Sequence, residues 1–406
     1  MVWPVIPPCP PLHKAAALTG HPLAHYFAGA TRFAPTCSLP RRHPCMKCRH
    51  LGKAGKGKAS GCDPGAVKAA AARYTGCSVA QGGPMTHKII LDTDPGIDDA
   101  MAILFAEAHP AIELLAITTV FGNATIENGT RNALWLKQQY GMKADVAQGA
   151  AAPLRREPVG PTTVVHGPSG FGDVTAGEVT LAPDPRPAWQ YIVEAVKAAP
   201  GEITLVTIGP LTNLALALQE APEITGLVKQ VVVMGGAFGV NGHRGNVTPY
   251  AEANIHDDPD AADRVFTADW PVVIIGLDVT QQSFFSSAYL DALRDDAGEP
   301  GRFLWDVSRF YLRFYSERIG LDGCHVHDPS AIAYVIDPTL FTLREGPVRV
   351  INEGPAIGHT LQKFDGKSHP HDGWADYRAQ QVGVAVRDQA LLALYRETLV
   401  AWGRSR

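Results

Sequence analysis

The stretch KIILDTDPGIDDA, residues 88–100, places four aspartates within eight positions directly after an apolar run. They are Asp92, Asp94, Asp98 and Asp99, and no basic residue lies among them. A helix N-terminus stabilises each nearby carboxylate by only ~0.3–1 kcal/mol, which is too little to hold four together. Repulsion would protonate some of them unless a cation is bound. The spacing therefore predicts a hard divalent cation, and Ca²⁺ suits it because that ion takes roughly six to eight oxygen ligands.

Each aspartate taken singly has a simpler interpretation. An aspartate before a helix is most often an N-cap, and Asp98 alone would be assigned that role. Capping does not explain the group of four. The group also contains no His or Cys, which argues against zinc.

Two histidine-containing elements could also contribute chemistry. HVHDP, residues 325–329, carries His327 and Asp328 ahead of an apolar stretch. By spacing alone, Asp328 is expected to be the N-cap of a helix that begins at Pro329. His166 lies in a glycine-rich loop, HGPSG, which by itself is weak support for a function.

The segment NVTPYAEAN, residues 246–254, carries amides and one carboxylate. Asn246, Glu252 and Asn254 suit hydrogen bonds to sugar hydroxyls, although an ordinary polar loop would have the same composition. The segment that follows, HDDPDAADRVF at 256–266, is expected to supply helix capping only.

The elements that must position these groups begin near residue 88. Apolar runs predict strands at 88–92, 112–120, 203–208, 228–236, 270–279 and 381–386. Helical spacing predicts helices at 98–109, 126–141, 211–219, 286–296, 301–318 and 329–336, and a last helix that ends near residue 402. This alternation predicts a Rossmann-like α/β fold, an open and mostly parallel sheet with helices on both faces, in one domain of residues 85–406.

Four of the predicted strands end in polar turns that contain or adjoin glycine. These turns carry Asp92 and Asp94, Gly122-Asn123, the run Gly209–Asn213, and Met234 with two glycines. In an open parallel sheet, ligands bind beyond the carboxyl ends of the strands. We therefore expect the four turns to converge on one site.

Residues 1–84 differ from the rest of the chain. This segment contains eleven Lys and Arg residues and a single acid, which gives it a net charge of about +10. The remainder contains 25 Lys and Arg residues and 39 acids, which gives it a net charge of about −14. The segment is rich in Pro, Gly and Ala without helical or strand periodicity, so we predict a low-complexity, disordered or dispensable extension and a functional start at Met85. Cys45 and Cys48 could form half of a zinc site, but no second ligand pair stands at a suitable spacing.

Composition argues against several partners. The net charge of the 406-residue chain is −4, which gives no reason to expect nucleic acid. No uninterrupted apolar run reaches the ~18 residues of a membrane span. Cys324 is the single cysteine outside the first 84 residues, so we expect a reducing, cytoplasmic environment.

Seven motifs follow one another between about residues 88 and 402: LDTDPGIDDA, ITTVFGN, VHGPSGFG, TIGPLTNLALAL, VVVMGG, NVTPYAEANIHDDPDAA and HVHDP. In this set the chain resembles the inosine–uridine-preferring nucleoside hydrolase family, and the first motif is the most specific. The resemblance implies calcium-dependent hydrolysis of the N-glycosidic bond of ribonucleosides, in nucleoside salvage. It also implies a homo-oligomer, either a dimer or a tetramer.

The same resemblance assigns the metal ligands. It implies that Ca²⁺ is bound by Asp94, Asp99, Asp328 and the backbone carbonyl of Thr212. Asp92 would lie behind them as a carboxylate that orients the site.

The resemblance also assigns the groups that contact the substrate. Ribose contacts are implied for Asp98, Asn123, Met234, Asn246, Glu252 and Asn254. Asp94 would act as general base on a metal-bound water. His327 matches the general acid for the leaving base, and His166 matches the second histidine of the base pocket.

The chain departs from the family pattern in ways that leave purine or pyrimidine preference open. Ala253 stands where several relatives have an aromatic residue that packs on the substrate. The loop FGVNGHRGN is longer than a tight turn requires, and its His243 and Arg244 could reach the leaving base. Tyr311 and Tyr315 are candidates either for a lid over the pocket or for the inward face of an amphipathic helix.

Two other classes stay open at the level of sequence. A phosphotransferase of the haloacid-dehalogenase type also places an Asp-x-Asp after its first strand, but it does not explain the Asp98-Asp99 pair or the HDP element. A non-catalytic nucleoside-binding protein could use the ribose-binding groups without turnover, although every catalytic position is filled. Release of free base would separate a hydrolase from a binding protein, and release of phosphate would indicate the phosphatase.

Overall fold

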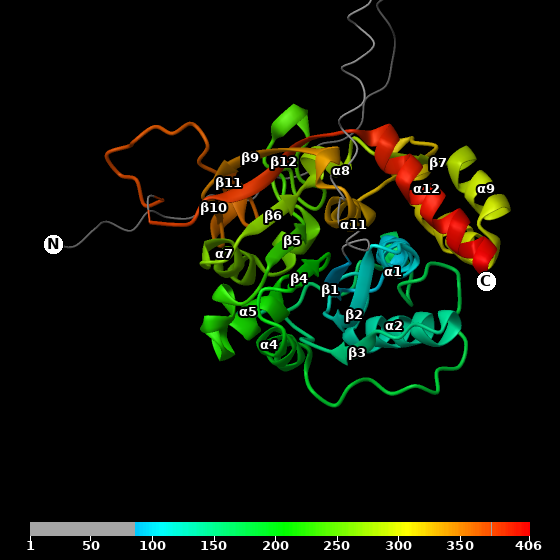
Figure 1. Cartoon of the computed structure of the whole chain (residues 1–406). Coiled ribbons are helices and arrows are strands. Elements are labelled where there is room, and N and C mark those ends of the chain that lie inside the picture. Colours follow the sequence, from blue (N-terminus) through cyan, green and yellow to red (C-terminus); the bar gives the residue numbers. More distant parts are fainter. Residues whose placement is uncertain (1–85, 375) are drawn as a thin grey trace, which may run out of the picture. The chain divides into compact units, whose positions relative to one another are not determined.

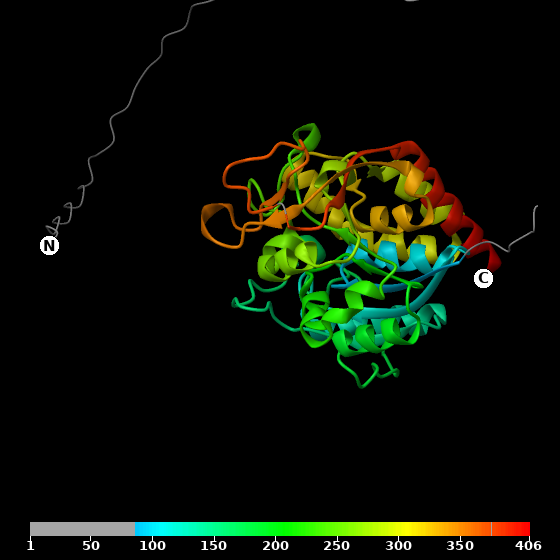
Figure 2. The same cartoon turned by 60° about the vertical axis from the view of Figure 1, so that its left-hand side comes forward.

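The computed structural model describes residues 86–374 and 376–406 (Figures 1 and 2). The predictions for the N-terminal extension and for Cys45 and Cys48 therefore lie outside the described residues. The core of the described chain is an eight-stranded sheet with the order β3-β2-β1-β4-β5-β6-β12-β9. In that order the strands are Asp145–Gln148, Ile112–Thr119, His87–Thr93, Ile203–Thr207, Gln230–Met234, Val272–Ile275, Gln380–Val386 and Phe341–Gly346.

Neighbouring strands of this sheet run parallel, except that β9 pairs antiparallel with β12 at one edge. Parallel strands need crossover connections, and the intervening helices therefore cover both faces. The predicted fold class is confirmed. No strand was predicted at β9, FTLREG, because this edge strand mixes charged and apolar residues.

The two faces of the sheet bury different side chains, because successive strand residues point in opposite directions. In β1, Ile89 and Leu91 belong to one buried apolar cluster and Ile90 belongs to the other. Burying side chains of this size stabilises the fold by ~1.5–3 kcal/mol each. This alternation fixes the register of the strand that carries the first aspartates.

One face packs against the helices α1, α2, α10, α11 and α12, and the other packs against α4, α5 and α7 (Figure 1). The first group spans Ile97–Ala108, Ile126–Tyr140, Gly298–Ile319, Asp328–Ile336 and Asp388–Ser405. The second group spans Ala188–Ala198, Thr212–Glu220 and Pro259–Thr267. Among the described residues, no helix combines the length and the apolar character needed to cross a membrane.

Short elements complete the described chain around this core. The remaining helices are three short ones, α3 (Thr163–His166), α6 (Ala253–Asp257) and α8 (Leu277–Thr280), and the longer α9 (Ser287–Asp296). Two small antiparallel sheets, of two strands each, pair β7 (Phe284–Ser286) with β8 (Gly323–His325) and β10 (Val348–Val350) with β11 (Thr360–Gln362). Single 3₁₀ turns lie at Pro222–Gly226, Val240–Gly242, Pro338–Leu340 and Gly354–Ala356.

Two details of the sequence prediction were wrong. The strand predicted at 270–279 ends at Ile275, because the carbonyl of Gly276 accepts the N–H of Thr280 and the chain turns into α8. Asp328 was expected to be an N-cap, but it is the first residue of α11 and its side chain makes no capping bond. The capping prediction for 256–266 is confirmed, since Asp258 accepts the N–H of Ala261 at the start of α7.

Candidate active site

The aspartate-rich stretch lies where the strand order reverses. β1 lies between β2 and β4, so the chain winds outward from it in both directions. Such a reversal leaves a crevice at the carboxyl ends of the strands, which is the usual ligand position in open α/β sheets. The structure thus brings the turns after β1, β2 and β4 together, as the sequence predicted.

Asp92 lies at the base of this crevice and is fully buried. Its Oδ1 accepts hydrogen bonds from the hydroxyl of Thr118 on β2 (2.6 Å) and the amide of Asn213 on α5 (2.8 Å). Burial raises the pKa of Asp92 to about 7, although the two hydrogen bonds act to lower it. The side chain ties three elements together, which suits the orienting role expected for it.

Asp94 follows the strand and is held between two strand-end turns. A Cβ added to Gly122 would lie 2.1 Å from its Oδ2, and one added to Gly209 would lie 2.7 Å from its Oδ1. The backbone N–H of Asn123 donates to Oδ2 at 2.7 Å. Burial, and then the charge of Asp99, raise the pKa of Asp94 well above its usual value. Both glycines are required because a side chain at either position would displace this carboxylate.

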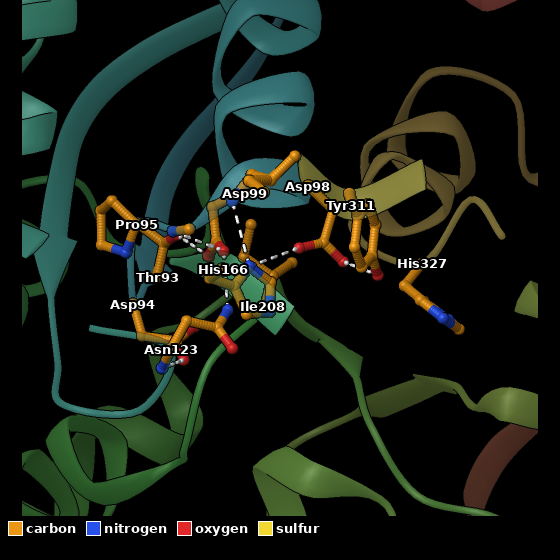
Figure 3. Close-up of polar contacts among 12 residues, drawn as sticks. Thr93, Asp94, Pro95, Asp98, Asp99, Asn123, His166, Ile208, Tyr311 and His327 are labelled. Atoms are coloured by element: carbon orange, nitrogen blue, oxygen red, sulfur yellow. Dashed lines mark hydrogen bonds and ion pairs between the residues drawn. The ribbon is translucent and has the colours of Figure 1, made fainter. Parts of the chain in front are cut away.

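Asp99 fixes the start of α1 to the same turn. It accepts the hydroxyl of Thr93, the backbone N–H of Gly96 (2.9 Å) and the side-chain amide of Asn123 (2.9 Å). Asn123 therefore bridges Asp94 and Asp99 (Figure 3). Its backbone and side chain both donate to carboxylates, so the turn after β2 stabilises negative charge.

Three carboxylates, from Asp98, Asp99 and Asp328, present ligand atoms within 4.8 Å of one another, and all three are buried. Burial and the neighbouring acids raise the pKa of Asp98 to about 8 and that of Asp328 well above its usual value. No Lys or Arg of the described chain is among the residues that line the adjoining pocket. The cluster thus lacks a compensating cation from the protein side.

The buried oxygens of this region fit a bound cation. Within residues 86–374 and 376–406, Asp94 Oδ1, Asp98 Oδ1 and Asp328 Oδ2 are buried and have no hydrogen-bond partner. Buried carboxylates are normally paired or coordinate a metal. The donor set contains oxygen alone, which suits a hard ion such as Ca²⁺ or Mg²⁺. Asp98 is one of the three clustered carboxylates, although the family resemblance implied that it contacts the ribose. Asp94 is not one of these three, but its Oδ1 has no hydrogen-bond partner within the described chain.

Thr212, the expected carbonyl ligand, begins α5. Its hydroxyl donates to Asp258 Oδ2 at 2.8 Å, so the N-cap of α7 orients the residue. The hydroxyl is thus committed to another partner, and the backbone carbonyl is the group left for the role implied by the sequence. That role stays a prediction.

Beyond the cluster lies a pocket of about 340 Å³, which is within the ~300–1,000 Å³ typical of small-molecule sites. Its wall includes Asp98, Asn123, His166, Met234, Asn246, Glu252, Asn254, His327 and Asp328 from the predicted set. The wall also includes Tyr311, Phe314, Tyr315, Ile319, His325 and Gln281. The predicted residues from distant parts of the sequence therefore share one cavity.

One part of the wall is built for hydroxyl groups. Both hydrogens of the Asn254 amide are used by the carbonyls of Ile208 (2.9 Å) and Met234 (3.2 Å), so the side chain offers an acceptor oxygen. Glu252 caps α6 and accepts the backbone N–H groups of Asn254, Ile255 and Gly236. Burial raises its pKa to about 7.

Asn246 completes this part of the wall. Its Oδ1 accepts the N–H of Ala253 at 3.0 Å, which leaves its amide hydrogens as donors. Carbonyl and carboxylate acceptors beside an amide donor can together bind several neighbouring hydroxyls.

His166 is a neutral hydrogen-bond donor. Its Nδ1 accepts the backbone N–H of Ile97 at 3.2 Å, so the hydrogen of the neutral ring resides on Nε2. Burial lowers the pKa of His166 to about 4. The 3.8 Å approach of Nδ1 to Asp98 is accordingly a contact without a shared hydrogen.

His327 stands at the far end of a polar chain that starts at the carboxylates. Its Nδ1 bonds the hydroxyl of Thr280 (2.8 Å) and its Nε2 bonds the hydroxyl of Tyr315 (3.1 Å). The hydroxyl of Tyr315 then lies 3.5 Å from that of Tyr311. Tyr311 in turn donates to Asp98 at 3.4 Å (Figure 3). Burial, and next the charge of His325, lower the pKa of His327 to about 3.

This geometry supports the inward-facing interpretation of the two tyrosines, and a lid role for them stays a prediction. Tyr311 and Tyr315 are on the inward face of α10 and are almost fully buried, and both line the pocket. Burial raises the pKa of both hydroxyls, which stay protonated and can donate or relay hydrogen.

The sequence interpretation missed Thr280 and Gln281. They follow β6, which was treated as an ordinary apolar strand, yet its end carries the polar run LDVTQQ. The rule that located the other four turns would have found this fifth one. His325 was quoted in the HVHDP motif without a role.

Comparison with known proteins gives a consistent result. The model of the family described as inosine-uridine preferring nucleoside hydrolase matches residues 89–393. A probable uridine nucleosidase 1 of Oryza sativa subsp. japonica is 39% identical over 77% of this chain and 97% of its own length. The inosine-uridine preferring nucleoside hydrolase of Leishmania major is 42% identical over 69% of this chain and 88% of its own.

A solved structure of a plant nucleoside hydrolase superposes with a TM-score of 0.76 at 37% identity, covering 79% of this chain and all of that one. The predicted family and enzyme class, a nucleoside hydrolase acting on N-ribosyl bonds, are confirmed, so the phosphatase and the non-catalytic binding protein are disfavoured. The chain belongs to the inosine-uridine preferring nucleoside hydrolase family.

Proposed function

We propose that this chain hydrolyses the N-glycosidic bond of ribonucleosides with Ca²⁺ bound at the carboxylate cluster. The observation that carries the proposal is the polarity of one pocket: uncompensated buried carboxylates at one end, and neutral histidines and tyrosines at the other. Hydrolysis needs both ends, because one must activate water while the other supplies hydrogen to the departing base.

Asp94, Asp99, Asp328 and the carbonyl of Thr212 would hold the ion, with Asp98 at the edge of the site. A bound divalent cation neutralises these carboxylates and makes a coordinated water more acidic. The unpartnered oxygens of Asp94 and Asp328 support this assignment. Asp92, bonded to Thr118 and Asn213, would orient the turn from below.

Asp94 would accept the proton of the attacking water. Its Oδ2 accepts the N–H of Asn123, so its Oδ1, which has no hydrogen-bond partner within the described chain, would serve both the cation and the water that the cation activates. An ionised carboxylate with one free oxygen in a water-poor crevice is suited to this role.

The ribose would be bound by the hydroxyl-recognising wall. Asn123, Asn246, Glu252, Asn254 and Asp98 supply its polar groups, and Met234 supplies an apolar contact. Bond breaking in such reactions passes through an oxocarbenium-like transition state. The carboxylate of Glu252 stabilises positive charge that builds on the sugar ring.

The leaving base would receive its hydrogen from the His327 end. Because His327 is neutral, the hydrogen comes from an N–H or O–H of the His327–Tyr315–Tyr311 chain, and His166 Nε2–H adds a second donor. The atoms balance: water gives a hydroxyl to the ribose, one proton goes to Asp94, and the base takes one hydrogen from the chain. Return of the proton to the chain completes the cycle.

The experiment is ribose release from uridine, inosine, cytidine and adenosine by the full chain, with and without a strong calcium chelator, and with phosphate assayed in parallel from ribonucleotides. We expect chelator-sensitive ribose release that Ca²⁺ restores and no phosphate release. Unaffected activity in chelator would overturn the metal assignment, and intact nucleosides in the presence of Ca²⁺ would overturn the activity. A cytoplasmic location and a homo-oligomeric state stay predictions alongside it.

A further inference from the structure

The base end of the pocket contains a side-chain amide with no role in the proposed reaction. Gln281 lines the pocket and directly follows Thr280, the residue whose hydroxyl holds His327. Tyr315, His325 and His327 line the same pocket. The ring centroids of His325 lie 5.6 Å from Tyr315 and 5.9 Å from His327, so these groups form one cluster.

The loop between β5 and α6 is fastened to α8, the short helix before Gln281. Asp278 of α8 accepts the N–H of Phe238 at 2.8 Å and that of Val240 at 2.6 Å. Asn241 then adopts a left-handed conformation, with φ 58°, which turns the chain back toward the helix. These contacts bring His243 of this loop to Gln281.

His243 determines which end of the Gln281 amide faces the pocket. The Nδ1 of His243 lies 2.8 Å from Gln281 Oε1. A carbonyl oxygen has no hydrogen to donate, so Nδ1 must carry it and Oε1 must accept it. The amide nitrogen of Gln281, with two N–H donors, is then the group left for a ligand.

The surroundings of this amide favour a flat, partly apolar ligand. Val247, Phe314 and Ile319 line the same pocket, and the described wall contains no Lys or Arg. His325 Nδ1 is buried and, within the described chain, has no hydrogen-bond partner. This part of the cavity thus offers hydrogen bonds and apolar contact without a counter-charge.

We propose that Gln281, oriented by His243, is a specificity-determining residue that recognises a carbonyl oxygen on the leaving base. The inference rests on the proposed function and deepens it. A keto base such as uracil or hypoxanthine presents an acceptor to the amide N–H. The corresponding amino base, cytosine or adenine, presents a donor at that position, and two donors facing each other leave both unpaired.

The size of the discrimination follows from that mismatch. An unpaired buried polar group costs ~1–3 kcal/mol, and each 1.4 kcal/mol is tenfold in a ratio, so the keto base is favoured by about 5- to 140-fold. The ratio of kcat/KM for uridine over cytidine, and for inosine over adenosine, measures it directly.

The test compares these two ratios in the full-length wild type and in Gln281→Glu, Gln281→Leu and His243→Ala. Gln281→Glu replaces the donor by an acceptor and should lower both ratios below those of Gln281→Leu, which removes the hydrogen bond. His243→Ala leaves Gln281 in place but frees its amide to rotate, so both ratios should fall toward one. A residue that only supported the fold would change kcat/KM for all four substrates alike.

Gln282→Ala is the matched control, because Gln282 is the next residue and bonds the backbone carbonyl of Asp278 outside the pocket wall. It should keep the wild-type ratios. A wild type that hydrolyses nucleosides without keto preference, or ratios unchanged in both Gln281 variants, would overturn this inference and leave the hydrolase assignment intact. Absence of ribose release from every nucleoside would overturn both.

Discussion

The two ends of the pocket solve opposite electrostatic problems. At the carboxylate end, burial raises the pKa of Asp94, Asp98 and Asp328, and free oxygens remain without a partner. At the histidine end, burial lowers the pKa of His166 to about 4 and of His327 to about 3, and both rings are hydrogen-bonded. The first end is incomplete without a cation, whereas His166 and His327 already have hydrogen-bond partners within the protein.

This difference indicates how one cavity can run acid and base chemistry at neutral pH. Desolvation disfavours charge at both ends, but only the carboxylates have unpaired oxygens that can recruit a charge from solution. The histidines have uncharged partners, the backbone N–H of Ile97 for His166 and two hydroxyls for His327, and therefore act as neutral hydrogen donors. Tyr311 and Tyr315 join the ends through hydroxyl contacts, so they belong to both.

The largest effect is expected from breaking the carboxylate end at Asp94. Asp94→Asn keeps the size of the side chain and its bond to Asn123 but removes the proton acceptor, so kcat should fall by ~10²–10⁴, the range for loss of a general base. Ribose release measures the loss, and an unchanged melting temperature shows that the fold is intact. Near-normal activity would refute Asp94 as the base.

Breaking the histidine end should have a smaller effect that depends on the leaving group. His327→Ala should lower kcat for inosine by roughly 10²-fold, because hydrogen donation to the base is lost. A 4-nitrophenyl riboside has a leaving group that departs without a proton, so the same variant should cleave it nearly as well as the wild type does. Asp94→Asn is the control, since it should lose activity on both substrates. Equal losses on both in His327→Ala would remove the proposed role in hydrogen donation.

The melting temperature should depend on pH and on Ca²⁺ differently for the carboxylate end and for the histidine end. Burial raises the pKa of Asp92 to about 7 and of Asp98 to about 8, so in metal-free protein their protonation stabilises the fold at low pH and is lost as pH rises through these values. The lowered pKa values of His166 and His327 act in the opposite direction, but only below about pH 6.5. The melting temperature of chelated protein should therefore fall between pH 6.5 and 8.5.

Added Ca²⁺ should reverse that fall, because it binds the deprotonated carboxylates. The rise in melting temperature on adding Ca²⁺ should be larger at pH 8.5 than at pH 6.5. Asp328→Asn should reduce the rise at both pH values. A Ca²⁺ effect independent of pH would argue against binding at these acids.

The carboxylate end was more predictable from sequence than the histidine end. Asp92, Asp94, Asp98 and Asp99 lie in one short stretch between a strand and a helix, so local spacing was enough to bring them together. The alternation of apolar runs likewise predicted the parallel sheet and the shared edge of its strands. Spacing alone made Asp328 a cap, and only the family resemblance assigned it as a metal ligand, because the partner that distinguishes a cap from a free carboxylate is visible only in three dimensions.

The histidine end depends on contacts between distant segments. His327 meets Thr280 across 47 residues and His166 meets Ile97 across 69, and neither pair has a local signal. Their protonation states follow from burial and from the atom each nitrogen faces, which spacing does not reveal. The fifth strand end, with Thr280 and Gln281, could have been found by applying one rule to every strand.

The smallest effect tests whether the histidine end is held as firmly as its hydrogen bonds indicate. Thr280→Val keeps the shape of the side chain and removes the hydroxyl 2.8 Å from His327 Nδ1. Because a neutral hydrogen bond contributes ~0.5–1.5 kcal/mol, kcat for inosine should fall about 2- to 10-fold, while the 4-nitrophenyl riboside should be cleaved at the wild-type rate. If both substrates lost activity equally, Thr280 would be a packing residue. If neither substrate lost activity, the bond of His327 Nε2 to Tyr315 would be enough to orient the ring. The orientation of His327 would then depend on the tyrosines that reach the carboxylate end and not on Thr280 of α8.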